Sequence, residues 1–348
     1  MRGPSPARSA RLAGAALGLA ADRLLGEPPA RVHPVAAFGS AMARFERLAY
    51  RNGRAAGMAY AGAGLALGTG TAPRVVIKDH PFLGEAVATA AAGYMATAGR
   101  SLAETATSIG RLLEQGRLEE AGQALPALVG RDPTGMDEKE MARAVVESVA
   151  ENTVDAVVAP AFWSAVTGTA GAFGYRAVNT MDSMVGHKSP RYLRYGWASA
   201  RLDDGANFIP ARLTVALVAA ARPGSAREVW RVVRRDGPKH PSPNAGPAEA
   251  AFAAALGLRL GGTNHYGDRT EVRGPLGHGR APEPADIARA VRLSRDVAGL
   301  LGALLVIGAG LGIGADRNRT GGRRADGRRQ RPTRSRTGAR RAGAEGRR

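Results

Sequence analysis

Three long stretches of the chain carry no charged side chain, and they restrict the possible folds more than any other feature. Each is close to the roughly 20 residues that an α-helix needs to cross the hydrocarbon core of a bilayer. The first two are rich in Ala, Gly and Thr and only weakly hydrophobic, so a large soluble all-α domain with buried helices is the alternative. The three stretches are Ala55–Pro73, Ala156–Tyr175 and Val297–Ala315.

The amino-acid composition adds two constraints to this pattern. The chain contains 47 Gly and no Cys. Small residues let helix backbones approach closely, as in packed membrane bundles, although a genome that favours Ala, Gly and Arg codons produces the same bias. The absence of Cys excludes disulfides and thiolate metal sites. No segment alternates between polar and apolar residues with a period of two, so we predict an all-α fold: a multi-pass helical membrane protein with polar loops.

The positive charge of the chain is concentrated at its C-terminal end. The formal net charge is +19, which usually suggests a nucleic-acid partner. About half of the excess lies in Asp316–Arg348, which has almost no apolar residues and cannot form a core. We therefore predict a membrane-embedded helical domain over residues 1–315 and a disordered Arg-rich tail over 316–348, with no specific nucleic-acid partner. An anionic lipid or RNA ligand for the tail, or a frameshifted gene end, remains open.

Polar segments between the apolar stretches also have readable structure. Arg100–Leu128 has apolar residues at helical spacing and is typical of an amphipathic helix. Asp137 precedes a helical pattern as an N-cap residue does. The proline-rich stretch Pro238–Pro247 does not fit a regular element.

Glu147, Glu151 and Asp155 follow one another at intervals of four residues, which places three carboxylates on one helix face. Like charges at that spacing repel. They are reasonable if a cation such as Mg²⁺ or a basic partner lies among them, or if Arg143, one turn earlier, neutralises Glu147 on a solvated face. Carboxylates at the mouth of an apolar segment are costly and usually functional, so we favour the functional interpretation.

Two further clusters resemble this one in composition. The tetrad Asn152–Asp155 is repeated at Asn179–Asp182, on the other side of the charge-free stretch, and Asp203-Asp204 precedes Asn207 by a few residues. Carboxylate and amide oxygens are ligands for hard cations, although a helix N-cap is the more common role of an Asp pair. The predicted metal ligands are Asp155, Asp182, Asp203, Asp204 and Asn207.

Basic and ring side chains complement the acids. The expected catalytic residues are Glu151, Asp155, Asp182, Lys188, Lys239 and His240. The expected substrate- or phosphate-binding residues are Asn152, Asn179, Arg191, Ser242, Asn244 and Asn264. Asn264 follows Gly261-Gly262, which would let backbone N–H groups approach a phosphate. Each of these residues taken alone is more often structural.

Six ordered motifs resemble the adenosylcobinamide-phosphate synthase family, a group of membrane-bound cobalamin biosynthesis proteins. The similarity extends over about residues 10–315, and the Arg-rich tail departs from the family pattern. The motifs are Ala21–Gly39, Val129–Glu138, Glu147–Trp163, Tyr175–Tyr192, Gly196–Thr214 and Arg235–Gly267.

The resemblance implies a reaction and its participants. The family joins a propionate of adenosylcobyric acid to aminopropanol, or to its O-phosphate, as an amide, with consumption of ATP. Phosphorylation of a carboxylate makes it a better electrophile, Mg²⁺ neutralises the phosphate charge, and a base keeps the amine unprotonated. The resemblance therefore implies an acid–amine ligase that uses Mg²⁺ and ATP, with membrane lipid and other corrinoid-pathway membrane enzymes as partners.

The expected location is the inner membrane, in several passes, with one active site facing the cytoplasm. The stretch Ala156–Tyr175 complicates this topology, because both of its flanks carry candidate site residues and a true span would separate them. A re-entrant or buried segment is the alternative. If the Asp155 and Asp203 carboxylates lie more than roughly 20 Å apart, two-thirds of a bilayer core, a single shared site is impossible.

Two rival functions fit parts of the pattern. The Asp and Asn clusters resemble those that hold Mg²⁺ on a diphosphate in an intramembrane prenyltransferase, which would not need ATP. A non-catalytic corrinoid carrier or assembly scaffold in the membrane would bind corrinoid without the acidic clusters.

Overall fold

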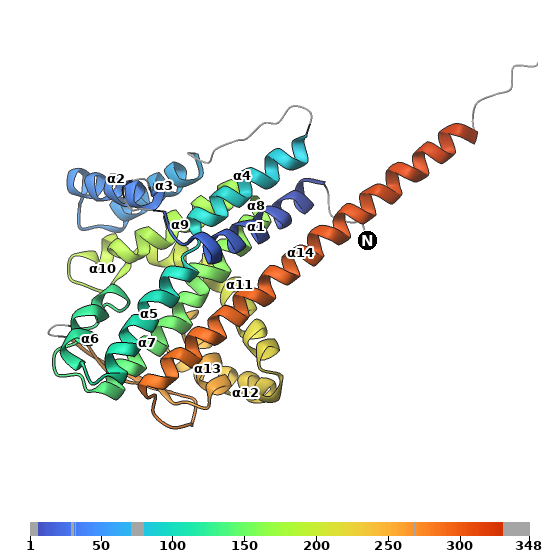
Figure 1. The fold of residues 1–348 in the computed structure, drawn as a ribbon. Coiled ribbons are helices and arrows are strands. Elements are labelled where there is room, and N and C mark those ends of the chain that lie inside the picture. Colours follow the sequence, from blue (N-terminus) through green and yellow to red (C-terminus); the bar gives the residue numbers. More distant parts are fainter. Residues whose placement is uncertain (1–5, 29–30, 32, 71–79, 267–268, 330–348) are drawn as a thin grey trace, which may run out of the picture.

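The computed structural model describes residues 6–28, 31, 33–70, 80–266 and 269–329; the side chains of residues 6, 264–266, 269, 270 and 313–329 lie outside that description. The described chain is a helical bundle with one small hairpin, as the prediction of an all-α fold requires (Figure 1). The main elements are α1 (Pro6–Leu25), α2 (Pro34–Ala49), α3 (Arg54–Gly70), α4 (Pro81–Ala96), α5 (Gly99–Glu114), α6 (Leu118–Ala124), α7 (Glu138–Thr153), α8 (Ala159–Thr167), α9 (Thr169–Met181), α10 (Tyr192–Tyr195), α11 (Trp197–Ala221), α12 (Ala226–Asp236), α13 (Ala245–Leu256), β1 (Leu260–Tyr266), β2 (Arg269–Leu276) and α14 (Pro284–Arg329).

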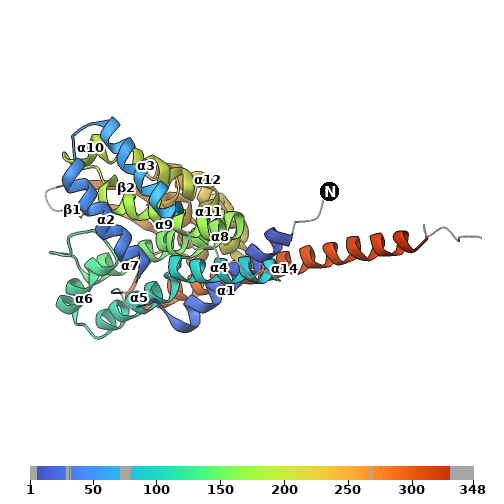
Figure 2. The same cartoon turned by 90° about the horizontal axis from the view of Figure 1, so that it is seen from above.

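Helix α14 is the longest element. It packs along α1, α5 and α7 and then extends beyond the rest of the molecule, as Figures 1 and 2 both show. The third apolar stretch, Val297–Ala315, is therefore part of one continuous helix that begins at Pro284. Its backbone continues to Arg329, into the segment expected to be a disordered tail; residues 330–348 lie outside the described residues, so the tail remains a prediction.

Small residues bring helices into close contact. Gly14 and Gly18 of α1 face the backbone of α4, and a Cβ atom at Gly14 would lie only 2.5 Å from the carbonyl oxygen of Ala86. The abundance of glycine thus has a packing role here, whatever its genomic origin.

The N-terminus of α7 forms as the sequence predicts. The Asp137 side chain accepts a hydrogen bond from the backbone N–H of Glu140, and the Glu140 side chain accepts one from the N–H of Asp137, which is a capping box. These contacts satisfy donors that would otherwise lack partners at the start of the helix. They stabilise the first turn of α7, a helix that leads directly into the π-helical turn with Asp155.

The charge-free stretch Ala156–Tyr175 is not one straight helix. The chain reverses at Gly168, which has a φ of 68°, and α8 and α9 pack against each other. A Cβ atom at Gly171 would overlap the carbonyl oxygen of Trp163, so this contact between the two helices requires glycine. This reversal returns both flanks of the stretch to the same side, as a re-entrant or buried segment requires.

Two short π-helical turns lie on either side of the α8–α9 pair. The first covers Val154–Val158, between α7 and α8, and the second covers Asp182–Gly186, directly after α9. π-helical turns inside α-helices occur frequently at functional sites.

The antiparallel hairpin of β1 and β2 was not predicted. Its register shifts between Leu260 and Gly262, and Gly261 and Gly262 have φ values of 83° and 110°, which favour glycine. A bulge formed by two glycines disrupts the alternation that identifies a strand in a sequence.

The multi-pass expectation receives no support from the helices. Within residues 6–28, 33–70, 80–266 and 269–329, no helix has both the length and the apolar character needed to cross a bilayer. The first and third apolar stretches end at Pro73 and Ala315, where residues 71–73 and the side chains of 313–315 lie outside the described part.

Candidate functional site

Asn179 joins two carboxylates that are far apart in the sequence. Its amide nitrogen lies 3.3 Å from Oδ2 of Asp155 and 3.4 Å from Oδ1 of Asp203. The three residues come from the first π-helical turn, from α9 and from α11. The carboxylates are therefore far closer than the roughly 20 Å at which a shared site becomes impossible.

Two buried side chains hold this centre in place. The Asn207 amide nitrogen donates to Oδ2 of Asp203 at 3.0 Å. The Tyr175 hydroxyl lies 2.9 Å from Oδ1 of Asn207 and 3.1 Å from the carbonyl oxygen of Asp155. Because Asn207 is only 1% exposed, this network fixes the relative positions of α9, α11 and the π-helical turn.

The electrostatics of the centre are those of crowded carboxylates. Burial raises the pKa of Asp155 well above its usual range, and the charges of Asp203, Glu151 and Asp182 raise it further. Burial, followed by the charges of Asp203, Asp204 and Glu151, raises the pKa of Asp182 to about 7. Burial also raises the pKa of Asp203 to about 6, against the hydrogen bonds from Asn207 and Asn179. Without a compensating cation, the acids therefore compete for protons near neutral pH.

Glu151 differs from the other acids in its exposure. Its side chain reaches solvent, yet burial among surrounding protein atoms is the main cause that raises its pKa, while Arg273 and Arg131 lower it. Glu151 thus lies in a pocket of protein atoms that is open to solvent, where its carboxylate can contact a ligand that enters from solvent.

The donor set fits a magnesium ion held by few protein ligands. In the part of the chain that the structure describes, no three His, Asp or Glu side chains form a metal-binding group. Mg²⁺, however, is commonly bound through one or two carboxylates together with water and substrate phosphates. Asp155 and Asp203 provide two carboxylates around one amide, which matches that pattern.

Glu147 does not belong to this centre, although it shares a helix face with Glu151 and Asp155. Its carboxylate pairs with Arg131, lies 4.0 Å from Arg143 and accepts the N–H of Gly261 at 2.7 Å. Burial alone would raise the pKa of Glu147, but these partners outweigh it and hold the pKa below its usual value. Glu147 therefore ties α7 to the preceding loop and to the hairpin.

The segment before α13 reaches the centre through Asn244. Its amide nitrogen donates to the carbonyl oxygen of Asp204 at 2.8 Å, and its Oδ1 accepts from Arg212 at 2.8 Å. Ser242 Oγ accepts the backbone N–H groups of Asn244 and Ala245 and so satisfies two donors at the start of α13. These contacts attach the proline-rich segment to α11.

His240 is buried and its tautomer follows from its contacts. Nδ1 lies 3.0 Å from the backbone nitrogen of Ser242 and 3.3 Å from its carbonyl oxygen; the shorter contact, in which Nδ1 accepts the N–H, assigns the proton of the neutral ring to Nε2. Nε2 faces Glu249 Oε1 at 3.6 Å. Burial, followed by the charge of Arg273, lowers the pKa of His240 to about 4, so the ring is neutral near pH 7.

Glu249 was missed by the sequence analysis. It is fully buried in α13, and neither of its oxygens has a hydrogen-bond partner among the described residues. Burial raises its pKa well above the usual range, and the charges of Glu147 and Glu151 add to that effect. A single Glu in the apolar sequence AGPAEAAFAAAL was the available signal, because a charged residue on an apolar face is rarely buried without a reason.

Several predicted residues are engaged in other contacts. Lys188 lies close enough to Asp204 to lower the pKa of that carboxyl, although burial raises it more strongly. Lys239 pairs with Asp236 at 2.7 Å. Arg191 pairs with Glu46 at 2.9 Å, and the Asn152 amide donates to Ser148.

The Gly261-Gly262 segment lines a cavity of about 460 Å³. The Gly261 N–H is already bound by Glu147, so it is not directed at a phosphate as the sequence suggested. Arg143 and Arg259 contribute cationic side chains to the same cavity. The side chain of Asn264 lies outside the described residues.

Comparisons with known proteins agree with the resemblance. The profile of the CobD/Cbib protein family matches residues 15–294. The cobalamin biosynthesis protein CobD of Mycobacterium tuberculosis strain H37Rv is 47% identical over 303 residues, which cover 85% of this chain and 96% of that protein. Those of Chromobacterium violaceum and Geobacter metallireducens are 42% and 43% identical, over 80% and 74% of this chain and 90% and 83% of their own lengths. No solved structure matches significantly. The chain therefore belongs to the CobD/Cbib family of cobalamin biosynthesis proteins.

Proposed function

We propose that the protein forms the amide bond between a propionate of adenosylcobyric acid and aminopropanol or its O-phosphate, with consumption of ATP. The observation that carries this proposal is the centre around Asn179, where two carboxylates from distant segments meet. Joining an acid, an amine and a phosphoryl donor requires charged groups that converge on one place. The family assignment supplies the pathway, and the chemistry of the centre supports this step within it.

In this proposal Asp155 and Asp203 would hold Mg²⁺, which would supply positive charge to neutralise the ATP phosphates. The Asn179 and Asn207 amides keep both carboxylates oriented. The cavity beside Arg143 and Gly262 is a suitable place for an anionic portion of a substrate.

Asp182 is suited to proton transfer. Its pKa of about 7 lies near neutral pH, and a general base is most effective when its pKa is close to the operating pH. In the proposed step, the ammonium group of aminopropanol transfers a proton to the Asp182 carboxylate. The propionate takes the γ-phosphoryl group of ATP to form an acyl phosphate, and ADP leaves. The neutral amine then attacks the acyl carbon, the bond from that carbon to the phosphate oxygen breaks, and the second proton of the amine leaves with the phosphate as hydrogen phosphate.

The proposal is tested with purified protein, adenosylcobyric acid, aminopropanol O-phosphate and Mg-ATP. We expect a corrinoid amide in the mass spectrum and equimolar ADP. Asp155→Asn and Asp203→Asn should each abolish both products, whereas Glu104→Gln, an exposed change on α5, should not. Complementation of a strain blocked at adenosylcobyric acid, with adenosylcobinamide as the bypass control, extends the test to cells.

The outcomes separate the rival functions. Corrinoid binding without any turnover, unchanged in Asp155→Asn, would support a carrier or scaffold. Activity with a polyprenyl diphosphate in the absence of ATP would support a prenyltransferase.

We further propose that the protein resides at the inner membrane with its site on the cytoplasmic side. The apolar stretches and the family resemblance support this location. After lysis and a carbonate wash, the protein should remain with the membrane fraction; quantitative recovery in the supernatant would contradict residence in the membrane.

A further inference from the structure

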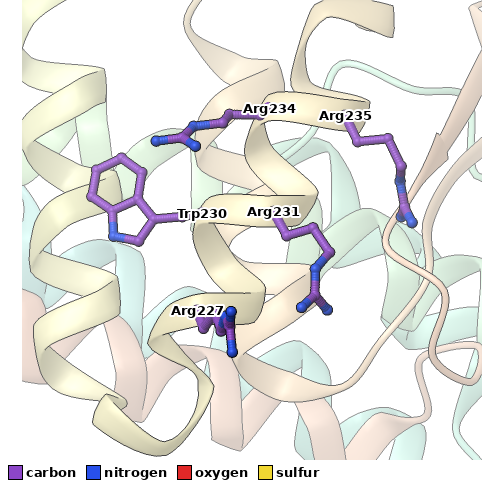
Figure 3. A pocket seen from close by; sticks show the side chains of 5 residues that line it. All are labelled: Arg227, Trp230, Arg231, Arg234 and Arg235. Carbon is purple, nitrogen blue, oxygen red and sulfur yellow. The ribbon is translucent and has the colours of Figure 1, made fainter.

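Helix α12 presents two opposite surfaces. Val229, Val232 and Asp236 are buried against the rest of the protein. The outward face carries four arginines and one tryptophan, which border a shallow hollow of about 710 Å³ with no acidic side chain in its lining (Figure 3). These five residues, which we call the arginine face, are Arg227, Trp230, Arg231, Arg234 and Arg235.

The arginine face retains positive charge that the protein does not neutralise. Arg231 pairs with Glu228 and Arg235 with Asp236. Arg227 and Arg234 are exposed and have no ionic or hydrogen-bonding partner among the described residues. Trp230 lies between them in the sequence and is 41% exposed, which is costly for an indole ring unless another surface covers it.

A second observation comes from α14. Arg222, four residues before α12, binds Asp296 at 2.8 Å. Asp296 is the last charged residue before the apolar run of α14. Beyond it, Leu304, Ile307 and Leu311 fall on one helix face and are 54%, 57% and 70% exposed.

The outer surface of α14 changes from charged to apolar along the helix. At a rise of 1.5 Å per residue, the exposed apolar row lies about 12 to 22 Å beyond Asp296 along α14. Helix α12 therefore begins at the level where the outer surface of α14 changes from charged to apolar. A bilayer has the same order of layers: charged headgroups first and apolar acyl chains beneath them.

We propose that the arginine face binds the phosphate headgroups of an anionic phospholipid surface, with Trp230 at the boundary between headgroups and acyl chains. Arginine contributes about 1 kcal/mol per residue near an anionic membrane, and tryptophan is enriched at that boundary. An RNA ligand would explain the arginines but not the exposed apolar row on α14. The inference rests on the proposed membrane residence and is independent of the ligase chemistry.

The test measures the affinity of the full-length protein for two kinds of vesicle by flotation. One is phosphatidylcholine alone, and the other contains 30 mol% phosphatidylglycerol, a composition chosen here. The double variant Arg227→Gln/Arg234→Gln is compared with Arg44→Gln/Arg47→Gln, which removes two exposed arginines from α2. The ratio of the two affinities cancels any insertion that does not depend on lipid charge.

We expect the preference of the wild-type protein for anionic vesicles to fall by about 30-fold in the α12 variant, the effect of two arginines, and to persist in the α2 variant. Salt at about 1 M should remove the preference, because it screens charges beyond roughly 3 Å. Brominated phosphatidylglycerol should quench less fluorescence in Trp230→Phe than in the wild type.

An equal preference in the wild type and the α12 variant would overturn the proposal. The proposal would also be overturned if the α12 variant kept its vesicle preference but bound a short RNA less well than the wild type. The same holds if the variant kept its vesicle preference but associated with itself less than the wild type. Absence of binding to either vesicle would instead contradict membrane residence itself. The amide-forming activity, assayed separately in detergent, should be the same in all of these variants.

Discussion

Two carboxylates, Glu147 in α7 and Asp155 in the π-helical turn that follows it, should behave in opposite ways when they are neutralised. Glu147→Gln removes one member of an ion pair whose side chains are only 2% and 6% exposed. The buried guanidinium of Arg131 then loses its counter-charge, which typically costs about 3 to 5 kcal/mol. Asp155→Asn instead removes a carboxylate that is surrounded by other acids, so it should not destabilise the fold.

Thermal unfolding followed by circular dichroism provides the comparison. At about 2 °C per kcal/mol for a chain of this size, Glu147→Gln should lower the Tm by about 6 to 10 °C. Asp155→Asn should leave the Tm unchanged or raise it while abolishing activity. The exposed pair Arg100–Glu104 is the control, and Glu104→Gln should cost only a fraction of a kcal/mol.

The stability difference between the wild type and Glu147→Gln should also depend on pH in one direction. Because its partners hold the pKa of Glu147 below the ordinary value of 4.5, the stabilisation is complete above that value and is lost as the pH falls through the lowered pKa. The difference between wild type and Glu147→Gln should therefore be largest near neutral pH and disappear in acid. A Tm within 1 °C of the wild type at pH 7.5 would refute the structural role of Glu147.

Other changes test further parts of the structure. Glu249→Gln should match the wild type in Tm at about pH 4 and exceed it by a growing margin as the pH rises above 4.5, because the pKa of Glu249 is raised above that ordinary value and the stabilisation of the neutral acid is lost as the pH rises; equal pH profiles would contradict this. Gly171→Ala should lower the Tm by several degrees, since the new methyl group overlaps the Trp163 carbonyl, whereas Gly53→Ala, which has open space, should not. Removing residues 316–348 should leave turnover intact, and a loss of turnover at normal protein level would show that the tail has a role.

The sequence predicted those parts of the fold that depend on local signals. The cap at Asp137 and the helix after it are encoded by neighbouring residues. The hairpin was missed because its glycine bulge and polar residues remove the alternation of a strand. The apolar stretch beside Asp155 suggested one long helix, since its composition does not reveal that Gly168 reverses the chain.

The candidate site was predicted in part for a similar reason. The Asp and Asn clusters indicated the chemistry, and the reversal between α8 and α9 brings Asp155 and Asn179 together. The pairing of Glu147 with Arg131 depends on a loop 16 residues earlier, which helix periodicity does not reveal. Tyr175 was not proposed, because its role depends on the tertiary contact with Asn207.

The two π-helical turns make the length of the chain as important as its composition. Asp155 and Asp182 both lie in such turns, and each turn is in effect an α-helix with one additional residue. Deleting one residue there would restore regular helical geometry and largely keep the register of the flanking helices, but it would change the direction in which the residues inside the turn point. A variant could thus retain every acidic and amide side chain and still point Asp155 away from Asp203. Alignment or redesign of this region must therefore preserve residue spacing between Asn152 and Pro160, in addition to residue identity.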